Sequence, residues 1–340
     1  MVARWGVQVG GSLSVAHQSH EFDEILLRDF VSFSQQQYDC LDYDPFHPMI
    51  VDLGRGLPME EGLWLSTLYM AFYNIGSAYA AFQASPPWRE LPAWTGVLPV
   101  GVQRRNLRGG KVLHHLDDFI RLTRLYGSAY AFLTKGFIGD PKKDWTQLKA
   151  NVSEPWGNGR WSIYTTAELY QKANKLPVWP CDIMNDDSTG PAAGLSKLFG
   201  VAAVDQTPDI LDPLADRLFR YMRGKMKTRI PYLPKGHYDY AMMESQLCDF
   251  NSLTKGRYYI GRDIDRDQER IKQAEELLQL QNIRMSLSEV WEARGRVFAP
   301  RYLGEVQKWD GRQDYALQHY KVTKEIADHK TIRIRKGFWL

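Results

Sequence analysis

The stretch EGLWLSTLYMAFYNIGSAYAAFQASPPWR, residues 61–89, decides the fold class, because no charged residue occurs between Glu61 and Arg89. A run of this length can span a bilayer, but it also contains serine, threonine, asparagine, glutamine and three tyrosines. Its large apolar residues recur in steps of 4, 4, 3, 4 and 3, at Trp64, Leu68, Phe72, Ile75, Tyr79 and Phe82. One apolar stripe favours a helix buried against a core over a membrane span. We expect this helix to run from Met59 to Ala84 and to end before Pro86.

Most of the remaining sequence also has helical periodicity. Further helices are predicted at 111–135, 166–174, 208–227, 238–254 and 266–281, with another starting at Pro191. Alternation typical of strands is confined to 257–261 and 331–335. The sequence therefore predicts a mainly α-helical protein with minor β elements. We divide it into an N-terminal extension of loops packed on the core (1–58), a helical core (59–261), and a C-terminal helix with a basic end (262–340).

Composition narrows the class of protein further. With 340 residues and 44% hydrophobic content, the chain can bury a large core. Lysine and arginine outnumber aspartate and glutamate by only 43 to 40, which does not by itself indicate nucleic-acid binding. The cysteines, Cys40, Cys181 and Cys248, are scattered, which argues against a disulfide framework or a zinc site and fits a reducing cytoplasm. The first twenty residues lack the apolar run of a secretory signal.

A glycine motif, NDDSTGPAAGLSKLFG at residues 185–200, contains the residue types of a phosphate-binding loop in a different order. It does not match the P-loop pattern, because Lys197 follows Gly194 by three residues. Pro191 instead predicts a helix start, where free backbone amides and the helix dipole attract anions. Thr189, Gly190, Gly194 and Lys197 are therefore candidate ligands for phosphate or the DNA backbone. The alternative is a capped helix that packs tightly on a neighbouring helix.

Two acidic residues, Asp186 and Asp187, precede this motif. They would repel an anion unless they bind a metal, cap the helix or act as a base. Magnesium commonly neutralises phosphates through few carboxylates, so Mg²⁺ is the candidate cofactor and Asp186 and Asp187 its candidate ligands. Asp187 is also a candidate general base.

An arginine cluster, Arg104, Arg105 and Arg108, lies in a predicted loop at 98–110. Each guanidinium offers a planar fork of donors that suits oxyanions such as phosphate. We predict that the three arginines bind phosphate or DNA. A solvated basic loop is the alternative.

The predicted helix at 238–254 carries a carboxylate on or beside its apolar stripe. That stripe comprises Tyr240, Met243, Leu247 and Phe250, and Glu244 lies one turn from Tyr240. Burial disfavours a charged carboxylate and raises its pKa, which suits a general base. Glu244 is therefore a candidate catalytic residue, with a salt bridge to an arginine as the alternative. Cys248 has no histidine near it in sequence and is interpreted as a buried structural thiol.

Three of these segments together resemble one known family. The segment 189–200 resembles the Gly-Pro-x-x-x-Gly-Leu-x-x-Leu signature of helical enzymes that hypermodify thymine in bacteriophage DNA, with one residue fewer between Pro191 and Gly194. The segment 243–250 is similar to their Glu-x-x-Leu-Cys-x-Phe helix, and 98–108 to their arginine-bearing segment. These are the amino acid:DNA transferases, also called α-glutamyl/putrescinyl thymine pyrophosphorylases. The resemblance covers about 59–261, and the lack of a P-loop distinguishes the chain from the related 5-hydroxymethyluracil DNA kinases.

The resemblance implies a helical fold akin to the helix-hairpin-helix DNA glycosylases and a reaction on DNA. In that reaction, 5-hydroxymethyldeoxyuridine activated as a pyrophosphate ester loses pyrophosphate to the amine of an amino acid such as glycine, or of a polyamine. Arg104, Arg105 and the helix start at Gly190 would stabilise the leaving group, and Glu244 or Asp187 would take the proton of the amine. The resemblance also implies a phage-encoded protein that acts in the host cytoplasm, with no membrane partner.

Two other functions remain open at this point. A glycosylase on the same scaffold would cut the base from the sugar, and a non-catalytic helical module would only bind DNA.

Overall fold

The computed structural model describes residues 21–184, 189–227, 230–303 and 312–326. In the first half of the chain the α-helices are α1 (Glu24–Cys40), α2 (His47–Leu53), α3 (Met59–Phe72), α4 (Ile75–Ala84), α5 (Lys111–Tyr126), α6 (Ala129–Leu133), α7 (Pro141–Ser153) and α8 (Arg160–Asn174). They are followed by α9 (Thr189–Phe199), α10 (Pro208–Lys225), α11 (Tyr240–Thr254), α12 (Arg262–Leu280), α13 (Ser288–Val297) and α14 (Arg312–Thr323). Short 3-10 helices are η1 (Ala93–Val97), η2 (Val102–Leu107), η3 (Ala203–Asp205) and η4 (Pro300–Tyr302).

The mainly α-helical prediction is confirmed, and no β-strand occurs in the described ranges. The predicted strand at 257–261 is instead the connection between α11 and α12. Its last amide, that of Gly261, donates to Asp42 Oδ2 at 2.6 Å rather than to a neighbouring strand. The second predicted strand, 331–335, lies outside the described residues.

The uncharged stretch forms two helices, so the prediction of one helix from Met59 to Ala84 is wrong. Helix α3 ends at Phe72, and the next residue, Tyr73, has a left-handed φ of 48°. Asn74 then caps α4 by accepting a hydrogen bond from the Ser77 amide at 3.0 Å. Asparagine competes well for such capping positions, which explains the break. Both helices are buried, and no helix in the described parts of the chain has both the length and the apolar character that a bilayer crossing needs.

The predicted helix at 111–135 also divides, into α5 and α6. Gly127 adopts a φ of 83° after α5, and Ser128 caps α6 by accepting from the Ala131 amide at 3.0 Å. Glu60 of α3 accepts from the amides of Ala129 and Tyr130 at 2.9 and 3.0 Å. Side-chain capping therefore fixes where helical periodicity is interrupted.

The N-terminal segment, predicted to be mainly loops, contributes α1 and α2. Asp23 caps α1 through the amides of Ile25 and Leu26, both at 3.0 Å, and the helix buries Phe30 and Phe33. The capping aspartate and the helical spacing of these apolar residues are the sequence signals from which α1 could have been predicted.

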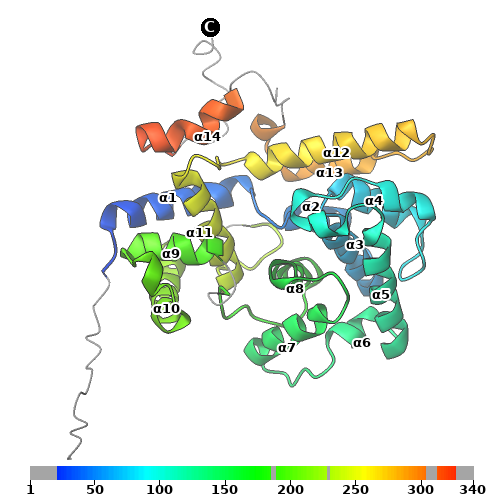
Figure 1. The fold of residues 1–340 in the computed structure, drawn as a ribbon, viewed down its shortest axis with the longest axis horizontal. Coiled ribbons are helices and arrows are strands. Elements are labelled where there is room, and N and C mark those ends of the chain that lie inside the picture. The colour runs from blue at the N-terminus through cyan, green and yellow to red at the C-terminus, as the bar shows by residue number, and fades with distance from the viewer. Residues whose placement is uncertain (1–20, 185–188, 228–229, 304–311, 327–340) are drawn as a thin grey trace, which may run out of the picture.

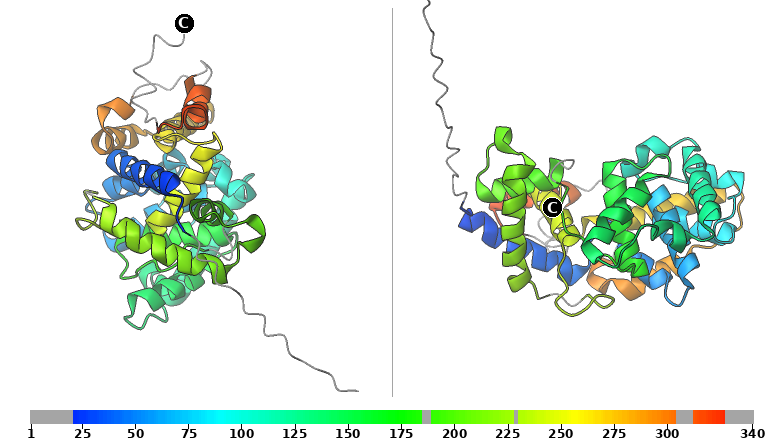
Figure 2. Two further views of the ribbon diagram at one scale, coloured as in Figure 1. Left: turned by 90° about the vertical axis from the view of Figure 1, so that its left-hand side faces the viewer. Right: turned by 90° about the horizontal axis from the view of Figure 1, so that it is seen from below.

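The helices form two groups. Figure 1 shows α9, α10 and α11 on one side and α3 to α8 on the other, with α12 and α13 running along the edge of the molecule. The same two groups are seen in the second view of Figure 2. Helix α9 packs against α11, and α12 packs against α4.

The loop between α1 and α2 ties this edge to the rest of the fold. Asp42 lies in that loop and is fully buried. Its Oδ1 accepts from the amides of Asp263 and Ile264 at 3.0 and 3.1 Å, so it caps the start of α12 from a distant segment. The loop that holds α12 also carries Asp44, two residues further on.

Candidate active site

A cavity of about 320 Å³ lies where residues from the two groups of helices meet. Helix α11 contributes Glu244, Ser245, Cys248 and Asp249, and the start of α9 contributes Thr189 and Gly190. Trp161 of α8 and Asp44 of the α1–α2 loop complete the wall on the other side. Four segments that are far apart in sequence thus meet at one small cavity.

The glycines of the 185–200 motif allow α9 to lie directly on α11. A Cβ atom at Gly194 would lie 2.3 Å from the Leu247 carbonyl oxygen, and one at Gly190 would lie 2.7 Å from Cys248 Sγ. Both distances are far shorter than a van der Waals contact, so only glycine permits this approach. Tight helix packing is therefore one role of the motif, and Gly190 also lines the cavity.

Glu244 lies in the cavity wall with only part of its surface accessible. Burial raises the pKa of Glu244 to about 8, and the neighbouring carboxyls of Glu168 and Asp44 act in the same direction. The Ser245 hydroxyl donates to Glu244 Oε2 at 3.4 Å, and no ion pair between Glu244 and an arginine forms within the described ranges. A carboxyl group with this pKa is a much stronger base than an ordinary glutamate.

Two further carboxyl groups face the same cavity. Burial, with Asp263 next to it, raises the pKa of Asp44 to about 6, and it accepts a hydrogen bond from the Tyr73 hydroxyl. Burial and Asp263 also raise the pKa of Asp249, which accepts from Gln37 Nε2 at 2.9 Å. Sequence reasoning missed both. Asp249 could have been found as the residue one turn beyond Ser245, but Asp44 lies in the segment interpreted as an extension.

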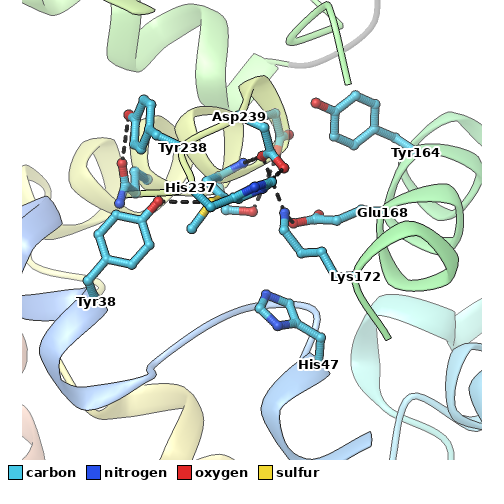
Figure 3. Close-up of polar contacts among 12 residues, drawn as sticks. Tyr38, His47, Tyr164, Glu168, Lys172, His237, Tyr238 and Asp239 are labelled. Carbon is cyan, nitrogen blue, oxygen red and sulfur yellow. Dashed lines mark hydrogen bonds and ion pairs between the residues drawn. The ribbon is translucent and has the colours of Figure 1, made fainter. Parts of the chain in front are cut away.

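A buried charged network lies next to the cavity and holds α8 against the start of α11. Lys172 Nζ lies 2.6 Å from Glu168 Oε1 and 3.4 Å from Asp239 Oδ1, and His237 Nε2 lies 2.8 Å from Asp239 Oδ2. Figure 3 shows Glu168 and Lys172 projecting from one helix towards Asp239 and His237. Burial raises the pKa of Glu168 to about 7. Burial opposes the charged form of Asp239, but Lys172 and the hydrogen bond from His237 hold the pKa of Asp239 below its usual value.

One face of α8 connects the cavity to this network. Trp161, Tyr164, Glu168 and Lys172 follow one another in steps of three and four residues, which places them on the same side of the helix. Trp161 lines the cavity, and the charge on Glu168 acts on the pKa of Glu244. The base in the cavity and the buried network are therefore electrostatically coupled.

The three predicted arginines do not line this cavity. Arg104 is 2% exposed, its Nη2 lies 3.3 Å from His115 Nε2, and burial lowers its pKa to about 10. Arg105 and Arg108 are exposed on the surface of η2 and the residue after it. Arg104 is thus buried, whereas Arg105 and Arg108 are exposed to solvent.

The remaining predicted ligands are distributed as follows. Lys197 lies near the other end of α9 from the cavity, where its Nζ donates to Thr254 Oγ1 at 2.5 Å. Burial and the nearby Lys255 and Lys324 lower the pKa of Lys197. Asp186 and Asp187 lie outside the described residues, and nowhere in the described part of the chain do three or more His, Cys, Asp or Glu side chains group in a way that could hold a metal ion.

Comparison with protein families identifies the central part of this structure. The family model described as amino acid:DNA transferase matches residues 101–259, from the residue before η2 into the loop after α11. We call residues 101–259 the transferase domain, after the family that this segment matches. No curated protein matches the chain.

The transferase domain contains most of the cavity wall, including Trp161, Gly190 and Glu244. Asp44 lies outside it, in the α1–α2 loop, and α12 follows it. Cys248 is part of the transferase domain and of the wall, but burial and the neighbouring carboxyls of Asp249 and Glu244 raise its pKa, so its thiolate is disfavoured. The description of the matched family indicates a transferase that acts on DNA.

Proposed function

We propose that this protein displaces pyrophosphate from 5-(pyrophosphoryloxymethyl)deoxyuridine in DNA with the amine of an amino acid, such as glycine, or of a polyamine. The product is a hypermodified thymine. The observation that carries the proposal is Glu244, a base with a pKa of about 8 in a cavity of the transferase domain. We also propose that its fold resembles that of the helix-hairpin-helix DNA glycosylases. The protein would be encoded by a phage and act in the cytoplasm of the host.

The reaction requires an amine without its proton. An alkylammonium group has a pKa of about 10.4, so transferring its proton to an ordinary glutamate costs about 8 kcal/mol, at about 1.4 kcal/mol for each pKa unit. Transfer to Glu244 costs only about 3 kcal/mol, because burial has already raised its pKa to about 8. Glu244 is therefore well matched to the proton that the donor has to lose.

The bonding changes follow from this assignment. The nitrogen lone pair forms the new C–N bond at the methylene carbon on C5 of the base, and the C–O bond to the pyrophosphate breaks. The proton on nitrogen moves to Glu244, and the electron pair of the broken bond leaves with pyrophosphate. No oxidant or reductant is needed.

The other cavity residues fit the two substrates. Asp44, with a pKa of about 6, is ionised at neutral pH and attracts an ammonium donor before it is deprotonated. Trp161 provides an aromatic surface on which a nucleobase can stack. A volume of about 320 Å³ is at the lower end of ligand pockets, which suits a small donor and one pyrimidine group rather than a duplex. Mg²⁺ at Asp186 and Asp187 is retained as the candidate cofactor.

The test is nucleoside mass spectrometry of DNA that carries the activated base. The DNA is incubated with the protein and a panel of amines, including glycine and putrescine, and then digested to nucleosides. We expect one donor to give a product nucleoside whose mass is that of the activated nucleoside plus that of the donor, minus that of pyrophosphoric acid. Glu244→Gln should abolish this product, whereas Glu276→Gln, at an exposed position on α12, should leave it unchanged.

Other outcomes identify the competing functions. Abasic sites and a released base would show a glycosylase. DNA binding without product from any amine, with the protein folded and the activated base verified, would show a binding module and contradict the proposal.

A further inference from the structure

Helix α12 carries three arginines on one face, at positions 262, 266 and 270. A spacing of four residues places successive side chains about 6 Å apart along a helix and on the same side of it. We call these residues the α12 arginine row. The row follows the segment matched by the transferase family and was not among the predicted binding residues.

The three arginines of the row do not line the cavity, but their charges act on a residue that does. Arg266, Arg270 and Arg262 each lower the pKa of Asp44, against the larger effect of burial, and Asp44 lines the cavity. The guanidinium of Arg270 lies 5.1 Å from the centre of the Tyr73 ring.

Tyr73 connects Arg270 to two cavity residues. Its hydroxyl donates to Asp44, and its ring packs edge-on against Trp161 with 4.9 Å between ring centroids. Arg270 is therefore one side chain away from the cavity surface. In Figure 1, α12 begins near the end of α11 and runs from there along the side of the molecule that holds α2 and α4.

These arginines keep donors for a ligand. Arg266 Nη1 lies 2.9 Å from Asp263 Oδ1, and one fifth of the Arg266 side chain is exposed. Arg270 Nη2 donates to Gln103 Oε1 at 3.2 Å, and the Arg262 guanidinium lies over the Tyr258 ring at 5.9 Å. A guanidinium has five N–H donors, so these contacts leave most of them for another acceptor.

We propose that Arg266 and Arg270, with Arg262 completing the row, bind the phosphate groups of the activated nucleotide and hold the departing pyrophosphate. This inference rests on the proposed function. Guanidinium groups bind phosphate oxygens through paired hydrogen bonds, and two of them one helical turn apart can each take one phosphoryl group of a diphosphate. Positive charge held there would stabilise the negative charge that develops on the leaving group.

The other candidate anion sites have competing contacts or face elsewhere. Arg104 is buried against His115, and Arg105 and Arg108 are exposed on η2. Like the α12 arginine row they do not line the cavity, but they are not among the charges that act on Asp44. Gly194 of the glycine motif is in contact with the α11 backbone. The α12 arginine row is the group of cations that acts on a cavity residue from a half-buried position.

Binding of inorganic pyrophosphate to the full chain, measured by isothermal titration calorimetry, tests the inference without any activated DNA. Arg266→Ala and Arg270→Ala should each weaken binding by tenfold or more. Arg266→Lys and Arg270→Lys keep the charge but not the planar fork, so intermediate affinities are expected. Arg284→Ala removes an exposed arginine just after α12 and should change the affinity by less than twofold.

Several results would overturn the assignment. These are absence of millimolar pyrophosphate binding by the wild-type protein, unchanged binding in folded α12 variants, or a loss seen instead in Arg105→Ala or Arg108→Ala. Tighter binding of glycine than of pyrophosphate, lost in the same α12 variants, would assign the row to the carboxylate of the donor and also overturn it. Circular dichroism melts establish that each variant is folded, and the lysine variants decide the question if an alanine variant is not.

The two proposals can fail separately. Glu276→Gln, at an exposed position on α12, should bind pyrophosphate as the wild type does, because it leaves both the cavity and the arginines unchanged. If no amine is transferred but pyrophosphate binding depends on α12, the proposed function fails and the anion site stands. If transfer occurs and pyrophosphate binding does not depend on α12, only the anion site fails.

Discussion

The rate of amine transfer should rise with pH in a way that reports the ionisation of Glu244. With a pKa of about 8, roughly a tenth of Glu244 is ionised at pH 7 and about nine tenths at pH 9. Only the ionised form accepts a proton, so kcat/KM at a subsaturating donor concentration should increase about tenfold per pH unit below pH 8 through this group alone. An ordinary glutamate would be fully ionised above pH 6 and would give no such dependence.

The donor amine also loses its proton as pH rises, so the assay has to separate two ionisations. Transfer is measured from pH 6 to 10 with donors of different basicity, by mass spectrometry of the product nucleoside. In the pH–rate profile, the rise caused by deprotonation of the donor should move with the pKa of the donor. The rise near pH 8, caused by ionisation of Glu244, should stay at the same pH for every donor. Glu168→Gln removes a neighbouring negative charge that raises the pKa of Glu244, so it should shift that rise to lower pH.

Glu244→Gln gives the decisive comparison. We expect kcat to fall by about 10² to 10⁴, the range typical of a lost general base, and the rise near pH 8 to disappear. The reasoning is refuted if the rise near pH 8 persists in Glu244→Gln, or if the wild-type rate with a fully deprotonated donor does not change between pH 6 and 8.

Glu244→Gln should lower the rate of transfer but raise the stability of the folded protein at alkaline pH. The folded-state pKa of Glu244 is raised above its unfolded value of about 4.5, so the folded state binds more protons between about pH 4.5 and 8 and loses stability as pH rises through that range. Above pH 8 the buried carboxylate should lower the free energy of unfolding by up to about 5 kcal/mol. Glu244→Gln has no ionisable group and should melt at a higher temperature than the wild type at pH 8.5, with little difference at pH 5. A variant that is less stable than the wild type at pH 8.5 contradicts this account.

Two substitutions test the packing around the site. Gly194→Ala places a Cβ 2.3 Å from the Leu247 carbonyl oxygen and should destabilise the protein by about 1–3 kcal/mol in urea denaturation. The control Gly224→Ala, in α10, meets no atom within 4 Å and should be neutral or slightly stabilising. Equal effects of the two substitutions would contradict close packing of α9 on α11. Lys172→Met leaves the carboxyls of Glu168 and Asp239 buried without their cation and should cost about 3–5 kcal/mol. A loss below about 1 kcal/mol in the same assay would show that the network does not need the ammonium group.

Local sequence determined much of the secondary structure. The apolar periodicity of the stretch from Trp64 to Phe82 predicts buried helix, and the structure has helix there except at the turn around Tyr73 and Asn74. The predicted helices at 208–227, 238–254 and 266–281 correspond to α10, α11 and α12. These features depend on residues within a few turns of one another, so they can be predicted from the sequence.

Sequence alone also indicated Glu244 and the glycine motif, because each stands out within its own helix. The inward position of Glu244 follows from its spacing to the apolar residues of α11, and the small residues of α9 suggested a close approach to some partner. The identity of that partner, Leu247 and Cys248 of α11, was not in the sequence pattern.

The tertiary structure alone decided what surrounds Glu244. Asp44 comes from a segment interpreted as an extension, and the α12 arginine row comes from a helix that was placed outside the predicted core. Their placement depends on long-range contacts, such as the capping of α12 by Asp42 and the packing of Tyr73 against Trp161. Periodicity and capping are set by neighbours along the chain. The pKa of a buried carboxyl is instead set by every charge and dipole that folding brings near it, and that environment exists only once the helices are packed.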